Sequence, residues 1–244
     1  MVRRNPVTGY PFPDFAAAIG VSAGVLAYAV RGPRSTLLAP SVYRGTSVRP
    51  AIALTFDDGP SESTPELLDI LARYGASATF FQCGVNVRRL PEIARDVAAA
   101  GHEIGNHTDS HPKLYLKSSA FIYRELEAAE ETIQRVTGYR PRLFRAPYGA
   151  RWFGLRDAQR RLGLMGVMWT TLALDWKWPA GRVVRRLLNG AQNGAIFCLH
   201  DGRRLEPRPD IRMTLQAVRE VLPKLIESGF HFERVTEILC PKKN

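Results

Sequence analysis

The stretch that decides the fold reads Ala51-Ile52-Ala53-Leu54-Thr55-Phe56-Asp57-Asp58-Gly59-Pro60. Its first six residues carry no charge, and two carboxylates, a glycine and a proline follow them. An uninterrupted apolar run is typical of a parallel strand covered on both faces, and Gly-Pro marks a turn. We therefore expect a buried strand at 51–56, with Asp57 and Asp58 at its carboxyl end.

The same alternation of strand and helix patterns continues along the chain. Strands are expected at 78–83, 102–105, 143–145, 166–169, 195–199 and 232–235, and helices at 65–74, 91–100, 121–137, 155–162 and 213–228. The alternation predicts an α/β fold with a parallel sheet, and seven or so strands favour a distorted (β/α)7-type barrel. We assign the catalytic domain to residues 51–244.

Residues 1–50 differ in character from the rest. Residues 15–30 carry no charge and are rich in alanine, glycine and valine, and residues 31–50 resemble a linker broken by glycine and proline. Sixteen helical residues span about 24 Å, less than the roughly 30 Å of a hydrocarbon core. Three interpretations stay open: a membrane anchor, a cleaved signal, or a helix packed on the domain. The expected location is the cell envelope, anchored or exported, and a cytoplasmic location is also compatible.

The chain is basic, with 34 Lys and Arg against 23 Asp and Glu and a formal charge of +11. Such a surface is either simply solvated or attracts an anionic membrane, a cell-wall polymer or nucleic acid. We find no zinc-finger or ribonucleoprotein motif, so no specific nucleic-acid partner is expected. The three cysteines are an odd number without a close pair, and Cys83 and Cys198 are expected as small buried hydrophobic residues.

Reactive side chains fall at the carboxyl ends of the expected strands, where parallel barrels place their active sites. Asp57 and Asp58 point in different directions, so one can bind a metal while the other faces a bound water; a solvated turn is the alternative. His107 and His111 have the i, i+4 spacing that brings two imidazoles to one ion on a helical turn, although such pairs also arise by chance. One carboxylate and two histidines would leave positions open for water and substrate.

Two further segments have the chemistry of an amide-hydrolysing site. Arg145 follows a strand and can orient a carboxylate, and the Pro147-Tyr148-Gly149 turn can present a backbone N–H to an oxyanion. Asp175-Trp176 lies in a loop, where an aromatic ring suits the apolar face of a sugar. Both segments are also compatible with purely structural roles.

His200 ends the apolar strand expected at 195–199. A histidine at this position can act as a general acid, or it can be a hydrogen-bonded core residue.

Taken in order, these segments resemble the NodB-type polysaccharide deacetylases, carbohydrate esterase family 4, over about residues 50–240. The Thr-Phe-Asp-Asp-Gly-Pro hexapeptide (residues 55–60) and the Gly-Asn-His-Thr-x-x-His run (residues 105–111) carry most of the resemblance. The resemblance implies a distorted (β/α) barrel that hydrolyses the acetamide of N-acetylglucosamine-type sugars. It also implies one divalent metal ion, Zn²⁺ or alternatively Co²⁺, Ni²⁺, Mn²⁺ or Fe²⁺, and an acetylated glycan such as peptidoglycan or chitin as the partner.

The resemblance also assigns roles that the residues alone leave open. Asp57 would be the general base, Asp58, His107 and His111 the metal ligands, and His200 the general acid.

Other positions would support these groups. Arg145 would orient the base, the Tyr148 N–H, presented by the turn at Pro147, would hold the oxyanion, and Asp175 and Trp176 would shape the groove.

The sequence departs from the family pattern at two positions. Leu172 stands where many relatives have an aspartate, and Cys198 replaces the leucine that lines the acetyl-methyl pocket. A hydrolase of a non-sugar amide or imide and an inactive glycan-binding relative are the alternative functions. Membrane contact through residues 15–30 is a further expectation.

Overall fold

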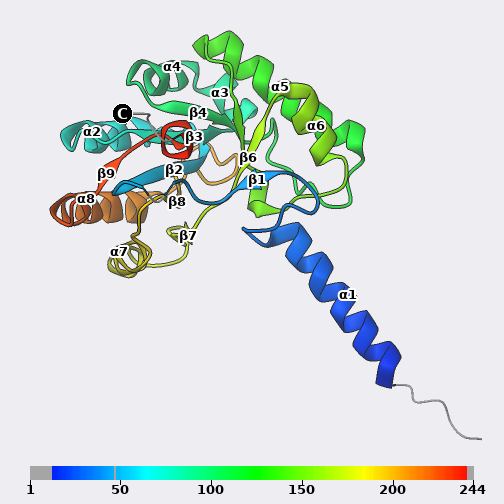
Figure 1. Cartoon of the computed structure of the whole chain (residues 1–244). Coiled ribbons are helices and arrows are strands. Elements are labelled where there is room, and N and C mark those ends of the chain that lie inside the picture. The colour runs from blue at the N-terminus through cyan, green and yellow to red at the C-terminus, as the bar shows by residue number, and fades with distance from the viewer. Residues whose placement is uncertain (1–12, 47, 241–244) are drawn as a thin grey trace, which may run out of the picture.

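The computed structural model describes residues 13–46 and 48–240 (Figure 1). Residues 1–12 and 47 of the predicted N-terminal segment and linker, and residues 241–244 of the predicted catalytic domain, lie outside this description. The strands are β1 Ser41–Val42, β2 Ala51–Gly59, β3 Ala78–Gln82, β4 Glu103–Asn106, β5 Leu143–Phe144, β6 Met165–Val167, β7 Thr171–Leu172, β8 Ala195–His200 and β9 His231–Phe232. The α-helices are α1 Pro13–Arg31, α2 Thr64–Arg73, α3 Gly84–Arg89, α4 Pro91–Ala99, α5 Ser119–Thr137, α6 Leu155–Leu162, α7 Ala180–Asn189, α8 Arg212–Glu227 and α9 Val235–Leu239, with a 3₁₀ turn at Pro147–Gly149.

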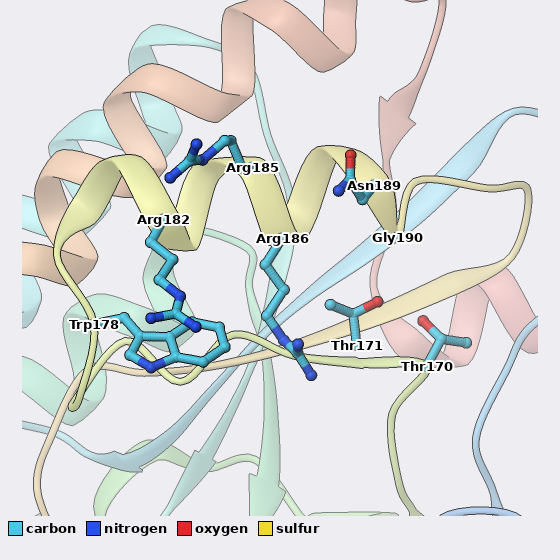
Figure 2. Close-up of a pocket in the computed structure, with 8 residues that line it drawn as sticks. All are labelled: Thr170, Thr171, Trp178, Arg182, Arg185, Arg186, Asn189 and Gly190. Carbon is cyan, nitrogen blue, oxygen red and sulfur yellow. The ribbon is translucent and has the colours of Figure 1, made fainter.

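The described strands form one parallel sheet that curls into an incomplete barrel surrounded by helices (Figure 1). Its order is β1-β6-β5-β4-β3-β2-β8-β7, and β9 adds to β2. Residues 168–170 connect β6 directly to β7, and the sheet ends at β1 on one side and at β7 on the other, so backbone pairing does not close the barrel. Figure 2 shows Thr170 and Thr171 at the start of β7, beside α7. The predicted (β/α)7-type barrel is confirmed, with β1 and β7 as short strands beyond the seven expected from the sequence.

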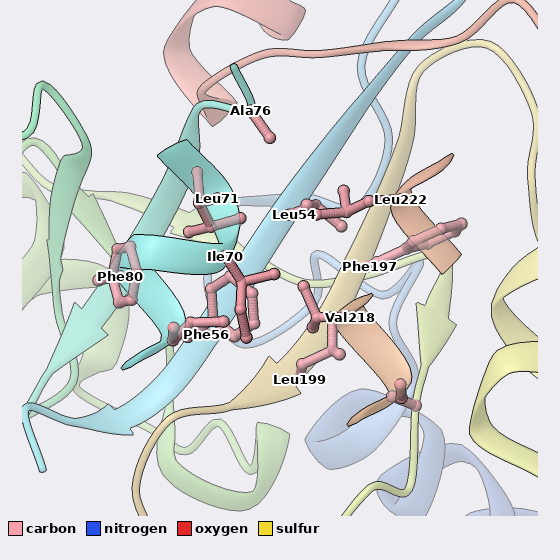
Figure 3. Packing of buried hydrophobic residues seen from close by; sticks show 14 of the residues in the cluster. Leu54, Phe56, Ile70, Leu71, Ala76, Phe80, Phe197, Leu199, Val218 and Leu222 are labelled. Atoms are coloured by element: carbon pink, nitrogen blue, oxygen red, sulfur yellow. The ribbon is translucent and has the colours of Figure 1, made fainter. Parts of the chain in front are cut away.

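Strand β2 is the centre of the fold because its two faces pack against different cores. All nine of its residues are buried. Leu54 and Phe56 face outward and join Leu71 of α2 and Val218 of α8 in the largest hydrophobic cluster (Figure 3). Ala53 faces inward, in the cluster that fills the barrel. Each fully buried Leu or Phe side chain contributes roughly 1.5–3 kcal/mol to folding.

Alternation along β2 then sets the position of the polar residues. Thr55 and Asp57 share the inward face with Ala53, because successive side chains of a strand point to opposite faces. The apolar run predicted from the sequence thus anchors the strand, and its carboxyl end carries Asp57 and Asp58 to the rim.

Helix α1 extends away from the barrel (Figure 1). Residues 22–28 are exposed, whereas Ala29 is buried. Its last turn is fixed by Arg151, whose backbone N–H donates to the Val30 carbonyl at 3.0 Å and whose guanidinium donates to the carbonyls of Gly32 and Ser35. Within the described residues, no helix has the length and apolar character needed to cross a membrane.

Candidate active site

Register within the sheet brings the candidate residues together. Strands β2 and β8 pair in parallel, with Asp57 opposite His200 and Thr55 opposite Cys198. Strand β4 ends at Asn106, immediately before His107. Because the carboxyl ends of parallel strands meet at one rim, residues from distant parts of the sequence converge there.

Asp58, His107 and His111 form a compact set of metal-ligating atoms. The Asp58 Oδ1 atom lies 2.9 Å from His111 Nε2 and 3.2 Å from His107 Nε2. All three side chains are buried, and one ligand atom from each lies within 4.8 Å of the others.

The backbone reaches this geometry through an irregular loop. The prediction that the two histidines lie on a helical turn is wrong, because Thr108 and His111 have φ values of 67° and 53°, which an α-helix does not allow. The imidazole rings nevertheless meet, with centroids 5.1 Å apart. Asp58 also has a positive φ, 73°, at the sharp bend after β2. Such strained positions are held by the surrounding packing and are common at functional sites.

The hydrogen bonds around these residues fit a bound cation. The Nδ1 atom of His107 lies 2.8 Å from the Arg145 carbonyl oxygen, so the neutral ring carries its proton there and Nε2 presents a lone pair to Asp58. A lone pair facing a carboxylate oxygen is repulsive unless a positive charge lies between them. Without a cation, burial would raise the pKa of the Asp58 carboxyl, and only hydrogen bonds donated by the two imidazoles from Nε2 would hold it well below its usual value.

The second oxygen of Asp58 is already bound. Its Oδ2 atom accepts the backbone N–H of Arg204 at 2.7 Å, and the Asp58 carbonyl accepts the Asn86 side-chain amide at 2.7 Å. These bonds fix the carboxylate so that Oδ1 faces the two imidazoles.

Asp57 points to the other side of the bend and pairs with Arg145. The Arg145 Nη1 atom donates to Asp57 Oδ1 at 2.7 Å and to Thr55 Oγ1 at 2.6 Å. The guanidinium is fully buried, and its Nε and Nη2 atoms donate to the carbonyls of Val167 and Met168 at 3.2 Å. Arg145 therefore fills the barrel interior beside the connection from β6 to β7 and holds Asp57 in one orientation.

Cys198 completes the surroundings of Asp57. Its thiol donates to Asp57 Oδ2 at 3.4 Å. Burial, reinforced by the charge of Asp57, raises the pKa of this thiol well above its usual value. Cys198 is thus a neutral, buried neighbour of the carboxylate.

His200 is held by Asp175 on the opposite flank of the site. The His200 Nδ1 atom lies 2.9 Å from Asp175 Oδ1, and Asp175 Oδ2 accepts the His200 backbone N–H at 2.8 Å and the Thr214 hydroxyl at 2.7 Å. Burial lowers the pKa of His200, but Asp175 outweighs it and the pKa rises to about 9. The ring is protonated at neutral pH, and Nε2 is the nitrogen left to face the site.

Aromatic and cationic residues form the rim. Trp176 meets the His200 ring edge-on at 4.7 Å, and Tyr148 meets the His111 ring at 4.8 Å. Tyr148 follows Pro147 in the 3₁₀ turn and has a φ of 59°. Lys113 and Arg204 place their charges 5.9 and 5.7 Å from the Tyr148 ring centre. The rim thus combines exposed rings with positive charge.

Sequence reasoning missed several supporting residues, namely Thr55, Asn86, Asp201, Arg204 and Thr214. Asp201 is fully buried, and burial raises its pKa to about 7 although the Thr64 hydroxyl donates to it at 2.7 Å. Its position after His200 is visible in the sequence, but its burial depends on the Gly59 turn, where a Cβ would clash with the Asp201 carboxyl.

Comparison with known proteins gives matches over most of the barrel. Residues 44–167 match the family model for polysaccharide deacetylase. Over 193 residues the chain is 35% identical to a peptidoglycan-N-acetylglucosamine deacetylase of Listeria monocytogenes, which covers 78% of this chain and 39% of that protein. Over 196 residues it is 36% identical to a chitooligosaccharide deacetylase of Azorhizobium caulinodans, covering 77% of this chain and 93% of that relative.

Solved structures agree with this result. A crystal structure of a peptidoglycan N-acetylglucosamine deacetylase superposes with a TM-score of 0.76 at 30% identity, covering 83% of this chain and 94% of the other. A carbohydrate esterase family 4 pseudoenzyme from Bacillus anthracis superposes with a TM-score of 0.75 at 27% identity, covering 83% and 69%.

The extent of these matches differs between relatives. The chain spans about two-fifths of the length of the Listeria protein but nearly all of the Azorhizobium one. The family model includes both carboxylates of the Asp57-Asp58 pair, both histidines of the candidate metal site and Arg145. The chain belongs to the polysaccharide deacetylase family.

Proposed function

We propose that this protein hydrolyses the N-acetyl group of N-acetylglucosamine-type sugars in a polysaccharide or oligosaccharide, releasing acetate. The observation that carries the proposal is the placement of a carboxylate, Asp57, and a protonated imidazole, His200, in one cluster beside a metal-ligating set. Asp57 and His200 lie opposite each other in the β2–β8 register, and Asp58, His107 and His111 lie beside them. An amide hydrolase needs a base for water, an acid for the leaving amine and a means of stabilising the oxyanion.

The donor set also indicates which metal the site would hold. One carboxylate and two imidazoles suit Zn²⁺, and Co²⁺, Ni²⁺, Mn²⁺ and Fe²⁺ accept the same ligands. When bound, such an ion would polarise the acetyl carbonyl and favour deprotonation of water. Asp58, His107 and His111 would hold it, with Asp58 oriented by the Arg204 backbone N–H.

The chain's own residues account for the proton transfers. Asp57 accepts a proton from the attacking water, and Arg145 keeps the carboxylate oriented through Nη1. His200 donates its proton from Nε2 to the departing sugar amine, while Asp175 holds Nδ1. Its pKa of about 9 keeps it protonated at neutral pH, as a general acid requires. The Tyr148 backbone N–H stabilises the developing oxyanion, and the products are acetate and a free amino sugar.

The names of the relatives support an acetylated glycan as the substrate. They describe deacetylases of peptidoglycan N-acetylglucosamine, peptidoglycan N-acetylmuramic acid and chito-oligosaccharides. The exposed Trp176 and Tyr148 rings at the rim suit the apolar faces of sugar rings.

Acetate release from a panel of acetylated glycans, with and without chelator, tests the proposal. The wild-type protein should release acetate, and the chelator should stop the release until metal is added back. Asp57→Asn should abolish turnover yet keep the bound metal, whereas His107→Ala should lose both. Hydrolysis of non-sugar amides without any glycan activity would favour the alternative substrate class. Metal binding without turnover of any substrate would favour an inactive relative, such as the pseudoenzyme with the same fold.

We also propose an envelope location, with α1 contacting a membrane surface. Val25, Leu26 and Tyr28 are between 45% and 55% exposed on α1, and Arg31 and Arg34 follow them with charges that attract anionic lipid. Flotation of the full chain with phosphatidylglycerol vesicles tests this contact. Replacing Val25 and Leu26 by serine should reduce flotation, and unchanged flotation would contradict it.

A further inference from the structure

A groove that the catalytic site does not use runs between α7 and β7 (Figure 2). It has a volume of about 480 Å³, and Thr170, Thr171, Trp178, Arg182 and Arg186 line it. Arg182 and Arg186 extend from α7 toward β7, and Arg185 leaves the helix on another side (Figure 2). We call this feature the α7 groove.

The arginines of the α7 groove lack acidic partners. Helix α7 contains no Asp or Glu, and within residues 13–46 and 48–240 none of Arg182, Arg185 and Arg186 forms an ion pair. Like charges one helical turn apart repel each other, so the cluster is unfavourable unless an anion compensates it. Arg145 in the barrel interior differs, because it forms an ion pair with Asp57.

The two inward-facing guanidiniums are also held in position. The Arg182 guanidinium lies 3.9 Å from the centre of the Trp178 ring, and that of Arg186 lies 5.3 Å away. The Nε atom of Arg186 donates to the Leu172 carbonyl at the edge of β7, which leaves its outer nitrogens available. Guanidiniums that are fixed in this way lose little conformational freedom when they bind an anion bidentately.

The shape of the α7 groove and its position in the fold indicate which kind of anion it would bind. The cationic side chains line a groove between a helix and a strand, which suits a single anionic polymer chain better than a flat membrane. Arg182 already covers the Trp178 ring, so the ring is not open for stacking with bases. The groove begins in the loop that carries Asp175 and Trp176, where the Trp178 backbone N–H bonds to the Leu174 carbonyl at 3.0 Å. The Trp178 end of the groove is therefore two residues along the chain from Trp176 at the catalytic rim.

We propose that the α7 groove binds carboxylate groups of the acetylated glycan strand whose sugar occupies the catalytic site. The inference rests on the proposed function for the identity of the strand. Arg182 and Arg186 bind the carboxylates, and the Thr171 hydroxyl is a further hydrogen-bond donor at the far end. The groove then favours acidic acetylated glycans over neutral ones without touching the reacting atoms.

Binding of polygalacturonate to the full chain tests the groove independently of turnover, because this polymer has carboxylates and no acetamide. The double variant R182Q/R186Q should bind it at least about tenfold more weakly, since two charge-assisted contacts are lost. The matched control R73Q/R124Q removes the same charge at two exposed positions outside the groove and should change binding by less than about twofold. If the double variant unfolds earlier, R182Q alone is used; in the free protein it breaks only the contact with the Trp178 ring, and it should still weaken binding more than R73Q/R124Q does.

Measurements of deacetylase activity distinguish a failure of this inference from a failure of the proposed function. With an acidic acetylated glycan, R182Q/R186Q should raise KM and keep kcat, and with neutral chito-oligosaccharides both constants should match wild type. If both double variants weaken polygalacturonate binding equally, the effect is one of net charge, and the proposed role of the groove is refuted. Selective loss of binding to inorganic polyphosphate, duplex DNA or phosphatidylglycerol vesicles, with polygalacturonate unaffected, would also overturn it. Absence of all deacetylase activity with intact selective binding would refute the proposed function alone.

Discussion

Replacing Asp175 by asparagine should move the alkaline limit of activity to lower pH. The Asp175 carboxylate lies 2.9 Å from His200 Nδ1 and is the foremost of the groups that raise the pKa of this histidine from 6.5 to about 9. Asparagine keeps a similar shape and can still accept the Thr214 hydroxyl, but it removes the negative charge. His200 should then lose its proton at a lower pH, and with it the ability to protonate the leaving amine.

The size of the effect follows from the geometry. One opposite charge within 4–6 Å shifts a pKa by about 1–3 units, and each unit corresponds to about 1.4 kcal/mol. Asp57 and Asp58 also raise the pKa of His200, so removing Asp175 should reverse part of the rise, about 1–2 units. At pH 8.5 the variant should retain roughly a tenth of the wild-type kcat/KM from this cause alone.

A pH profile of kcat/KM between pH 6 and pH 10 measures the shift. The wild-type rate should fall as pH rises through about 9, because the protonated acid is present below the pKa and lost above it. Thr214→Val is the matched control, since it removes a hydrogen bond to Asp175 and keeps the charge. An alkaline limb at the same pH in Asp175→Asn and wild type would refute the assignment of His200 as the acid.

Three other perturbations test the surrounding structure. Arg145→Met should lower the free energy of unfolding by about 3–5 kcal/mol in a urea titration, because the facing carboxylate is left buried and unpaired; a loss below 1 kcal/mol would contradict the buried pair. Arg151→Ala should speed amide hydrogen exchange at residues 32–35 while the barrel core exchanges as before, since it removes the donors to those carbonyls; equal acceleration everywhere would argue against a local clamp. Iodoacetamide at pH 8 should label the exposed Cys240 and leave Cys83 and Cys198 unmodified by mass spectrometry, because burial raises the pKa of both thiols; rapid labelling of Cys198 would show an open site.

The long strands and most helices could be predicted because their signals are local. The apolar run at 51–56 identifies β2, and the helix expected at 155–162 coincides with α6. Strands β1 and β7 were missed, since each has two residues and exists only through pairing with β6 or β8. Helix α7 was also missed, although Val183, Val184 and Leu187 form its buried side, because four of its ten residues are polar and clustered.

The candidate site was predictable in its residue types and less so in its geometry. Strand ends are visible in the sequence, so Asp57 and His200 could be placed on one rim. The loop between His107 and His111 was taken for a helical turn because spacing alone does not reveal a positive φ. The partners of the site depend on tertiary contacts: Thr214 comes from α8, and Arg145 binds the Val167 carbonyl at the end of β6. Such contacts have no local sequence signal.

Because β2 pairs with β8, the parts of the candidate site come together at different stages of folding. Cys198 meets Asp57 across 141 residues of chain, the length that must be synthesised and folded before the two strands join. Strands β2, β3 and β4 follow one another in the sequence and can pair early, so the residues of the metal site come together from the first half of the chain. The chain between β2 and β8 is long, and pairing strands across such a separation is slower than forming contacts between neighbouring segments. We therefore expect His200, the proposed general acid, to join the site after Asp58, His107 and His111 have come together.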